Sequence, residues 1–207
     1  LHDGRIIRLE ADKVVTLANT GGRPLGMMFD KAGNLIICDA WKGLLQLAPD
    51  GQFTTLVSEV NGVPLTFTDD LDIANDGKIY FTDASTRFGM REWGSTFEAS
   101  ILDLMEGQPT GRVFEFDPEK KSSRLIAHGL SFANGVALSQ DEQTLFVTET
   151  GRYRVWKVAV AADRLDVGGG SPQATVLFDN LPGYPDNLMR GADGRIWLGF
   201  SGPRSPN

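Results

Sequence analysis

The chain has 207 residues, of which 41% are hydrophobic and 23% are charged, a balance typical of a globular protein with a sizeable core. The formal net charge of −7 argues against a nucleic-acid partner, because binding nucleic acid requires a basic face. No apolar run reaches the about 18 residues that a membrane helix needs, so the sequence predicts no membrane span in this chain.

β-Hairpins of two kinds alternate along the chain. In the outer kind, one face of each strand is expected to be more exposed to solvent. In the inner kind, an apolar strand is joined through a polar turn to a strand rich in aromatic or β-branched residues. In chain order the outer hairpins are expected at 4–18, 43–57, 111–127 and 153–178, and the inner ones at 27–40, 71–84, 136–150 and 188–201. This alternation is the repeat from which the fold is inferred.

Two successive hairpins make one four-stranded sheet, and repeating that sheet predicts an all-β fold, a β-propeller. Residues 1–207 are expected to form one propeller domain of roughly four blades' worth of strands, incomplete at both ends. The insert from Ser85 to Gly111 is expected to be a loop over one face, with only Glu98 to Met105 resembling a helix. Cys38, the only cysteine, excludes an internal disulfide, leaves the redox compartment open, and is expected to be a buried core thiol.

The segments that enter the inner strands carry the candidate site. Residues entering equivalent strands of a propeller converge on its central channel, and three of these junctions offer oxygen atoms. The candidate ligands are Asp69, Asp70, Asn134, Asp186 and Asn187. Carboxylates and carboxamides without Cys or His favour Ca²⁺ over Zn²⁺ or Cu²⁺. The alternative is that these Asp and Asn residues only shape turns.

Other polar residues have less specific patterns. Asp39, Asp83 and Glu149 recur at strand ends, where they are expected to bind neighbouring backbone. His128 lies in a linker that leads to Asn134, where it would be either a general base or, more commonly for such a position, a structural residue. No GxSxG elbow and no phosphate-binding glycine loop is present in the sequence.

Several motifs together resemble the strictosidine synthase-like family of six-bladed propellers, which is related to paraoxonases and gluconolactonases. The motifs are "DGRIIRL", "GRPLGM", "TDDLDIANDGKIYFTDAS", "MEGQPTGRVFEFDP", "FANGVALSQDEQTLFVTET" and "PGYPDNLMR". The resemblance implies a chain that is longer at both ends, with a calcium-ligating Glu upstream and, in the plant synthases, a catalytic Glu downstream. Neither glutamate corresponds to a residue of this sequence.

The resemblance also implies an activity. Metal-dependent relatives have Asn or Asp at the positions of Asp69, Asn134 and Asp186, whereas true strictosidine synthases lack these ligands. The chain is therefore expected to be a calcium-dependent hydrolase of small-molecule esters or lactones, with Asp186 or Asp69 acting on water. Two alternatives stay open: a non-catalytic binding or scaffolding propeller, and a synthase that forms carbon–carbon bonds.

Overall fold

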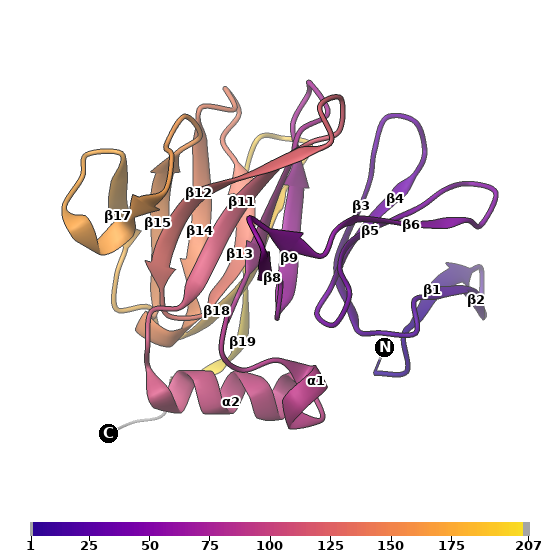
Figure 1. Ribbon diagram of the computed structural model, residues 1–207, viewed down its shortest axis with the longest axis horizontal. Helices are drawn as coiled ribbons and strands as arrows, with labels where there is room; N and C mark the ends of the chain where they lie inside the picture. Colours follow the sequence, from indigo (N-terminus) through magenta and orange to yellow (C-terminus); the bar gives the residue numbers. More distant parts are fainter. Residues whose placement is uncertain (1, 205–207) are drawn as a thin grey trace.

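The computed structural model describes residues 2–204, which fold mainly into separate antiparallel β-sheets (Figure 1). The first four-stranded sheet contains β3 (Pro24–Phe29), β4 (Leu35–Asp39), β5 (Gly43–Leu47) and β6 (Phe53–Val57). The second contains β9 (Thr68–Ile73), β10 (Ile79–Asp83), β11 (Gly111–Asp117) and β12 (Ser122–Leu130), and β16 (Leu165–Asp166) adds to it in parallel beside β12. The third contains β13 (Ala133–Leu138), β14 (Thr144–Glu149), β15 (Arg154–Ala159) and β17 (Ala174–Phe178).

Three two-stranded sheets complete the β-structure of the described residues. They pair β1 (Arg5–Glu10) with β2 (Lys13–Asn19), β7 (Glu59–Val60) with β8 (Val63–Pro64), and β18 (Gly183–Arg190) with β19 (Ile196–Pro203). Short 3₁₀ turns cover Thr150–Arg152 and Val167–Gly169. Every predicted hairpin is present as an antiparallel pair, so the mainly β fold is confirmed. Within residues 2–204 no sheet closes on itself, and the number of blades stays a prediction.

Inner strands in the middle of the molecule are buried because sheets pack against both of their faces, whereas β3, β18 and β19 are partly exposed. All five residues of β4 and all five of β10 are buried, as near-continuous apolar strands are when both faces are covered. One core cluster lies between the second and third sheets and includes Val113, Val136 and Val147. Another lies between the first and second sheets, where the rings of Phe81 and Phe114 stack at 5.3 Å. These clusters hold neighbouring sheets at fixed positions, as close-packed interiors do.

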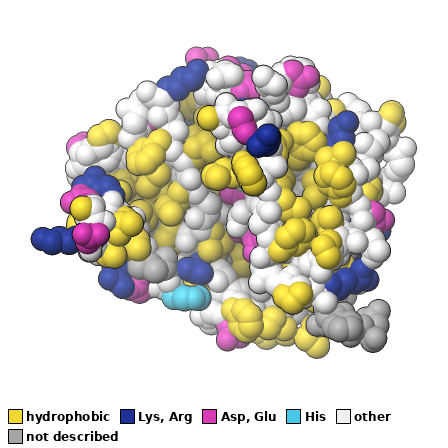
Figure 2. Space-filling model, turned by 180° about the vertical axis from the view of Figure 1, so that it is seen from behind, with side chains coloured by type: hydrophobic (Ala, Val, Ile, Leu, Met, Phe, Trp, Pro, Cys, Tyr) yellow, Lys and Arg dark blue, Asp and Glu magenta, His cyan; other side chains and the backbone are white. Residues whose placement is uncertain are grey.

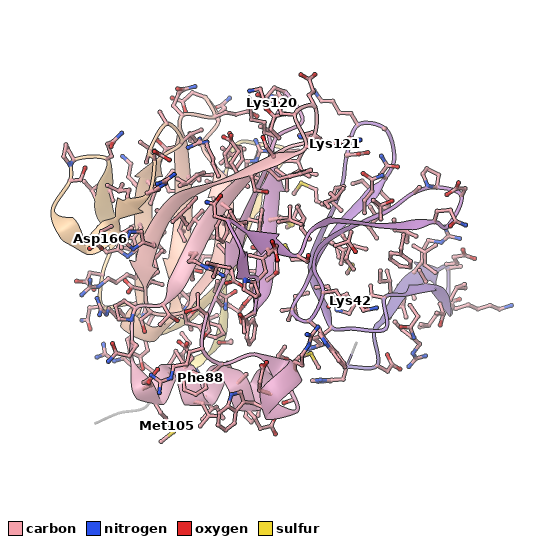
Figure 3. The ribbon with its side chains drawn as sticks, viewed as in Figure 1. Lys42, Phe88, Met105, Lys120, Lys121 and Asp166 are labelled. Atoms are coloured by element: carbon pink, nitrogen blue, oxygen red, sulfur yellow. The ribbon has the colours of Figure 1, made fainter. Side chains whose placement is uncertain are left out.

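The insert differs from the expected loop. It contains α1 (Met90–Trp93) and α2 (Thr96–Glu106), which lie across one end of the sheets (Figure 1). Ser95 caps α2 by accepting a hydrogen bond from the Glu98 backbone at 3.3 Å. The turn with Lys120 and Lys121 lies at the opposite end of the molecule (Figure 3).

The sequence analysis expected a helix only at Glu98 to Met105, which is confirmed, whereas α2 begins two residues earlier and α1 was expected to be loop. The buried residues of α2 are Thr96, Ala99 and Asp103, whereas Phe97 and Met105 are 65% and 80% exposed. Leu102 and Leu104 pack against the core, whereas Phe97, Ile101 and Met105, spaced four residues apart, form an exposed apolar stripe. Phe88 instead packs between the insert and the sheets, and Met105 points away from them (Figure 3).

Candidate metal centre and substrate cavity

The innermost strands β3, β9, β13 and β18 lie next to one another in that order. Glycines permit the close approach. A Cβ on Gly26 would meet the Asp70 side chain at 2.6 Å, and a Cβ on Gly135 would meet the backbone of Asp186 at 2.5 Å. Both distances are too short for a side chain, so these two glycines let the strands converge.

Two threonines fix the relative positions of the converging strands. The Thr148 hydroxyl on β14 accepts a hydrogen bond from the Gly135 backbone at 2.6 Å and donates one to the Asp186 carbonyl at 2.7 Å. The Thr82 hydroxyl on β10 repeats this arrangement, accepting from the Asp70 backbone and donating to the Asn134 carbonyl. The sequence analysis missed these threonines, although each one directly precedes a strand-end acidic residue.

The predicted ligands occupy equivalent positions in the sheets. Pro24, Thr68 and Ala133 pair with the strand-end residues Asp39, Asp83 and Glu149, respectively. The residues that follow these three are Leu25, Asp69 and Asn134. The threonine bonds make Asp186 the counterpart of Asn134 in the next sheet. The first sheet therefore presents an apolar residue where the next three present oxygen.

All five predicted ligand residues line one cavity of about 870 Å³. Asp69, Asp70 and Asn134 are buried, Asp186 is half-buried and Asn187 is exposed. Apolar side chains line the same cavity: Leu25, Phe67, Phe132 and, from α2, Phe97 and Leu104. Figure 2, which views the molecule from behind the view of Figure 1, shows hydrophobic side chains in patches with a few acidic side chains between them.

Burial disfavours the ionised form of the carboxyl groups in the cavity. Burial, together with the negative charges of Asp186 and Asp70, raises the pKa of Asp69 well above its usual value. Burial also raises the pKa of Asp186, against hydrogen bonds from the side chains of Asn134 and Ser201. Positive charge added beside these carboxyl groups would favour their ionised forms.

Asp70, the residue after Asp69, accepts several hydrogen bonds. Burial raises its pKa to about 6 despite hydrogen bonds from surrounding groups. The backbone N–H groups of Val136 and Leu188 donate to its Oδ2 at 3.3 and 3.4 Å, and the Asn187 side chain also bonds to it. Asp70 therefore ties β9 to β13 and β18, which suits a supporting role better than direct ligation.

The donor set fits a hard cation. Asn134 Oδ1 is buried and accepts no hydrogen bond from any described residue, which is costly for an amide oxygen unless a ligand is bound. Asp69 and Asp186 would add carboxylate oxygens, so the set would be entirely oxygen, as Ca²⁺ prefers. Within residues 2–204, no group of three or more His, Cys, Asp or Glu side chains has the arrangement of a metal site. A cation here would therefore depend on the amide of Asn134.

The structure does not bring His128 to the cavity. His128 lies half-buried on the outer strand β12, where its register partners are Arg112 and Asp166. It is not among the residues that line the cavity. It therefore has no contact there with Asp69, Asn134 or Asp186, and the role of general base has no geometric support.

The three strand-end carboxylates have the structural role that the sequence predicted. Asp83 Oδ1 accepts from the Thr66 and Phe67 backbones at 2.9 and 2.7 Å, and its Oδ2 binds Arg112. Asp39 Oδ1 accepts from three backbone N–H groups, those of Arg23, Trp41 and Lys42. Glu149 accepts from the Ser131 backbone and from the Trp156 indole. Each of them shapes the segment that leads into or out of an inner strand.

The fold and the paired sheets define the class: a β-propeller-like protein. Structurally similar proteins include a gluconolactonase of Xanthomonas campestris, with a TM-score of 0.74 at 23% identity, covering 96% of this chain and 63% of that one. They also include a calcium-binding regucalcin of Agrobacterium tumefaciens, with a TM-score of 0.67 at 16% identity, covering 96% and 60%. At these identities the similarity shows the fold alone.

The resemblance to the strictosidine synthase-like family is confirmed. The strictosidine synthase family model matches residues 69–163. The chain is 38% identical to a strictosidine synthase-like protein of Arabidopsis thaliana, covering 89% of this chain and 46% of that protein. It is 36% identical to the adipocyte plasma membrane-associated protein of Salmo salar, covering 99% and 50%. The chain spans about half the length of these curated relatives. No helix of the described part is both long and apolar enough for a membrane crossing.

Proposed function

We propose that this chain carries the catalytic core of a calcium-dependent hydrolase of small-molecule esters or lactones. We further propose that its sheets belong to one six-bladed propeller domain, of which they supply roughly four blades' worth of strands. The observation that supports the activity is the convergence of Asp69, Asn134 and Asp186 on one large cavity, with the Asn134 oxygen unbonded. The calcium-binding and gluconolactonase names of two structural neighbours agree with this proposal.

The residues around the cavity have complementary roles in the proposed reaction. When bound, a calcium ion would polarise the substrate carbonyl and stabilise negative charge on its oxygen. Asp186 is held by Asn134 and Ser201, so its carboxylate is placed to orient a water molecule. Asp69 would accept a proton as the water oxygen bonds to the carbonyl carbon. The same carboxyl would return that proton to the leaving oxygen as the ester C–O bond breaks.

Turnover and metal binding test the proposal together. A panel of aryl esters and lactones would be assayed with calcium and with EDTA, and calcium affinity would be measured by calorimetry. We expect turnover only with calcium, and an about 100-fold loss of kcat/KM together with weaker calcium binding in Asp186→Ala. Asp76→Ala, which removes an exposed turn carboxylate, is the matched control and should change neither quantity.

The rival functions give different results in these assays. Calcium binding that depends on Asp186, with no turnover on any ester or lactone, would identify a non-catalytic binding propeller. Turnover that persists in EDTA would contradict the calcium-dependent mechanism. A synthase would show neither hydrolysis nor a requirement for Asp69, Asn134 and Asp186.

A further inference from the structure

Arg23 brings a positive charge to the wall of the cavity, and the sequence analysis did not single it out. It directly precedes β3, is half-buried and lines the cavity. Its backbone is held on both sides, since its N–H donates to Asp39 Oδ1 at 3.0 Å and its carbonyl accepts from the Ala40 N–H at 2.9 Å. The start of this side chain is therefore fixed by a structural carboxylate.

The guanidinium group of Arg23 is oriented by one hydrogen bond, and its charge acts on Asp69 without a direct hydrogen bond or ion pair. Its Nε donates to the Thr96 hydroxyl of α2 at 3.3 Å. Its two terminal nitrogens form no hydrogen bond and no ion pair with any residue in the described part of the chain. The pair of terminal nitrogens is the fork that binds a carboxylate through two parallel hydrogen bonds.

Other arginines that reach the interior use their terminal nitrogens within the protein. Arg112 Nη2 binds Asp83 at 2.6 Å and the Pro64 carbonyl at 2.8 Å. Arg124 binds Glu115 and the carbonyls of Ala162 and Val160. Arg23 differs from both because its terminal nitrogens have no hydrogen-bond or ion-pair partner among the described residues.

The surroundings of Arg23 indicate what kind of ligand fits. Thr96 is the first residue of α2, so the positive end of the helix dipole reinforces the charge of Arg23 on this wall. Apolar side chains, including Phe67, Phe97 and Phe132, line the same cavity. The carboxylates Asp69, Asp70 and Asp186 come from other strands and would repel an anion placed among them. A ligand with an apolar body and an anionic end would therefore be oriented with that end at Arg23.

We propose that Arg23 is a specificity-determining residue that binds the carboxylate of an amphiphilic substrate, an ester or lactone whose apolar acyl chain ends in a carboxylate. The hydrolysis part of this inference rests on the proposed function, whereas the binding part does not. Thr96 is a positioning residue, since its hydroxyl orients the guanidinium through Nε.

A matched pair of esters tests the selectivity. Mono-4-nitrophenyl adipate and 4-nitrophenyl hexanoate share the leaving group and the acyl length, and differ only in the terminal carboxylate. In Arg23→Gln we expect an about 10- to 100-fold loss of kcat/KM for the adipate ester and a change within about 2-fold for the hexanoate ester. Arg91→Gln, which removes a charge on α1 outside this cavity, should change neither. An equal loss on both esters, or no loss on the adipate ester, would overturn the inference.

Binding without chemistry separates this inference from the hydrolase proposal. Calorimetry with the calcium-loaded protein would compare 6-phenylhexanoate with its neutral amide, 6-phenylhexanamide. We expect the acid to bind about 10-fold more tightly, and Arg23→Gln to remove that difference. If no ester is hydrolysed but this difference is present, the hydrolase proposal fails and the carboxylate site stands. If esters are hydrolysed but acid and amide bind alike, the carboxylate site fails alone.

A second variant keeps the test valid if Arg23→Gln does not fold. Arg23→Lys keeps the charge but lacks the planar fork, so its preference for the acid should be smaller than that of the parent protein. A preference for the acid that is unchanged in Arg23→Lys would overturn bidentate binding by Arg23.

Discussion

Two sets of acidic side chains lie in the interior of this protein, and their surroundings differ. The strand-end carboxylates end β4, β10 and β14 and are completely buried: Asp39, Asp83 and Glu149. The cavity carboxylates enter β9 and β18: Asp69, Asp70 and Asp186. Both sets include members that accept hydrogen bonds, but Asp83 is paired with Arg112, whereas Asp69 lies near the negative charges of Asp186 and Asp70. Burial by itself therefore does not distinguish these two carboxylates, and the charge of their neighbours does.

Charge balance explains the difference physically. Arg112 and two backbone N–H groups oppose the effect that burial has on the pKa of Asp83. For Asp69 the other carboxylates add to the effect of burial, and Arg23 is the one opposing charge among the main contributors. A buried anion without compensation costs several kcal/mol, roughly what a bound cation would recover.

The largest expected effect on stability comes from replacing a strand-end carboxylate. Asp83→Ala would leave the buried Arg112 without its carboxylate partner and the Thr66 and Phe67 N–H groups without this acceptor. We expect the free energy of unfolding to fall by about 3–5 kcal/mol, measured by urea unfolding, equally with calcium and with EDTA.

The control for this variant is an exposed carboxylate. Asp76→Ala removes an ion pair with Lys78 and should change stability by less than about 0.5 kcal/mol. A loss in Asp83→Ala as small as this, or one present only with calcium, would mean that Asp83 belongs functionally with the cavity carboxylates.

Removing the charge of a cavity carboxylate should raise the free energy of unfolding when calcium is absent, the opposite of the effect expected for Asp83→Ala. Asp69→Asn deletes a buried charge that Asp186 and Asp70 repel. In EDTA near pH 7.5 we expect the variant to be about 1–3 kcal/mol more stable than the parent, because the desolvated charge is gone. With calcium we expect the ranking to reverse, because the variant loses a ligand. Thermal unfolding in both buffers checks this, and a variant less stable in EDTA would contradict it.

A smaller effect, and the pH dependence, is expected from Asp103. This residue on α2 is buried without a hydrogen-bond partner among the described residues, and burial raises its pKa from 3.8 to about 6, with a smaller contribution from Glu106. A raised folded-state pKa favours the protonated form, so the ionised carboxylate destabilises the fold increasingly as pH rises from 3.8 to about 6. Asp103→Asn should therefore stabilise the protein by about 1 kcal/mol at pH 7.5 and by almost nothing near pH 4.

The measurement for Asp103 is the difference in unfolding free energy between parent and variant across that pH range. A matched control is Asp141→Asn, because the pKa of Asp141 is lowered by its Ser139 and Gln143 partners. Its effect should be small at every pH above about 5. A stabilisation by Asp103→Asn that does not vary with pH would show that the charge of Asp103 is not its cause.

The predictable part of this fold is local. Each hairpin was expected because a polar turn and the strand pattern beside it are adjacent in sequence, as in "ANDGKIYF" between β9 and β10. The recurring acids Asp39, Asp83 and Glu149 were also interpreted correctly, since each acts on nearby backbone. The helix α2 was predicted only in part, as Glu98 to Met105, because its fully buried residues are Thr96, Ala99 and Asp103 and do not form an apolar stripe.

The sequence by itself determined the hairpins, their alternation, the family resemblance and the equivalence of Asp69, Asn134 and Asp186 within their repeats. Only the tertiary structure decided that these residues line one cavity, that His128 lies away from it, and that Arg23 and α2 complete its wall. Hairpins form between residues close in sequence, so a short stretch of sequence is enough to predict each of them. The cavity depends on how separate sheets pack, and Arg23 meets Thr96 across 73 residues of chain, a distance over which no local pattern operates.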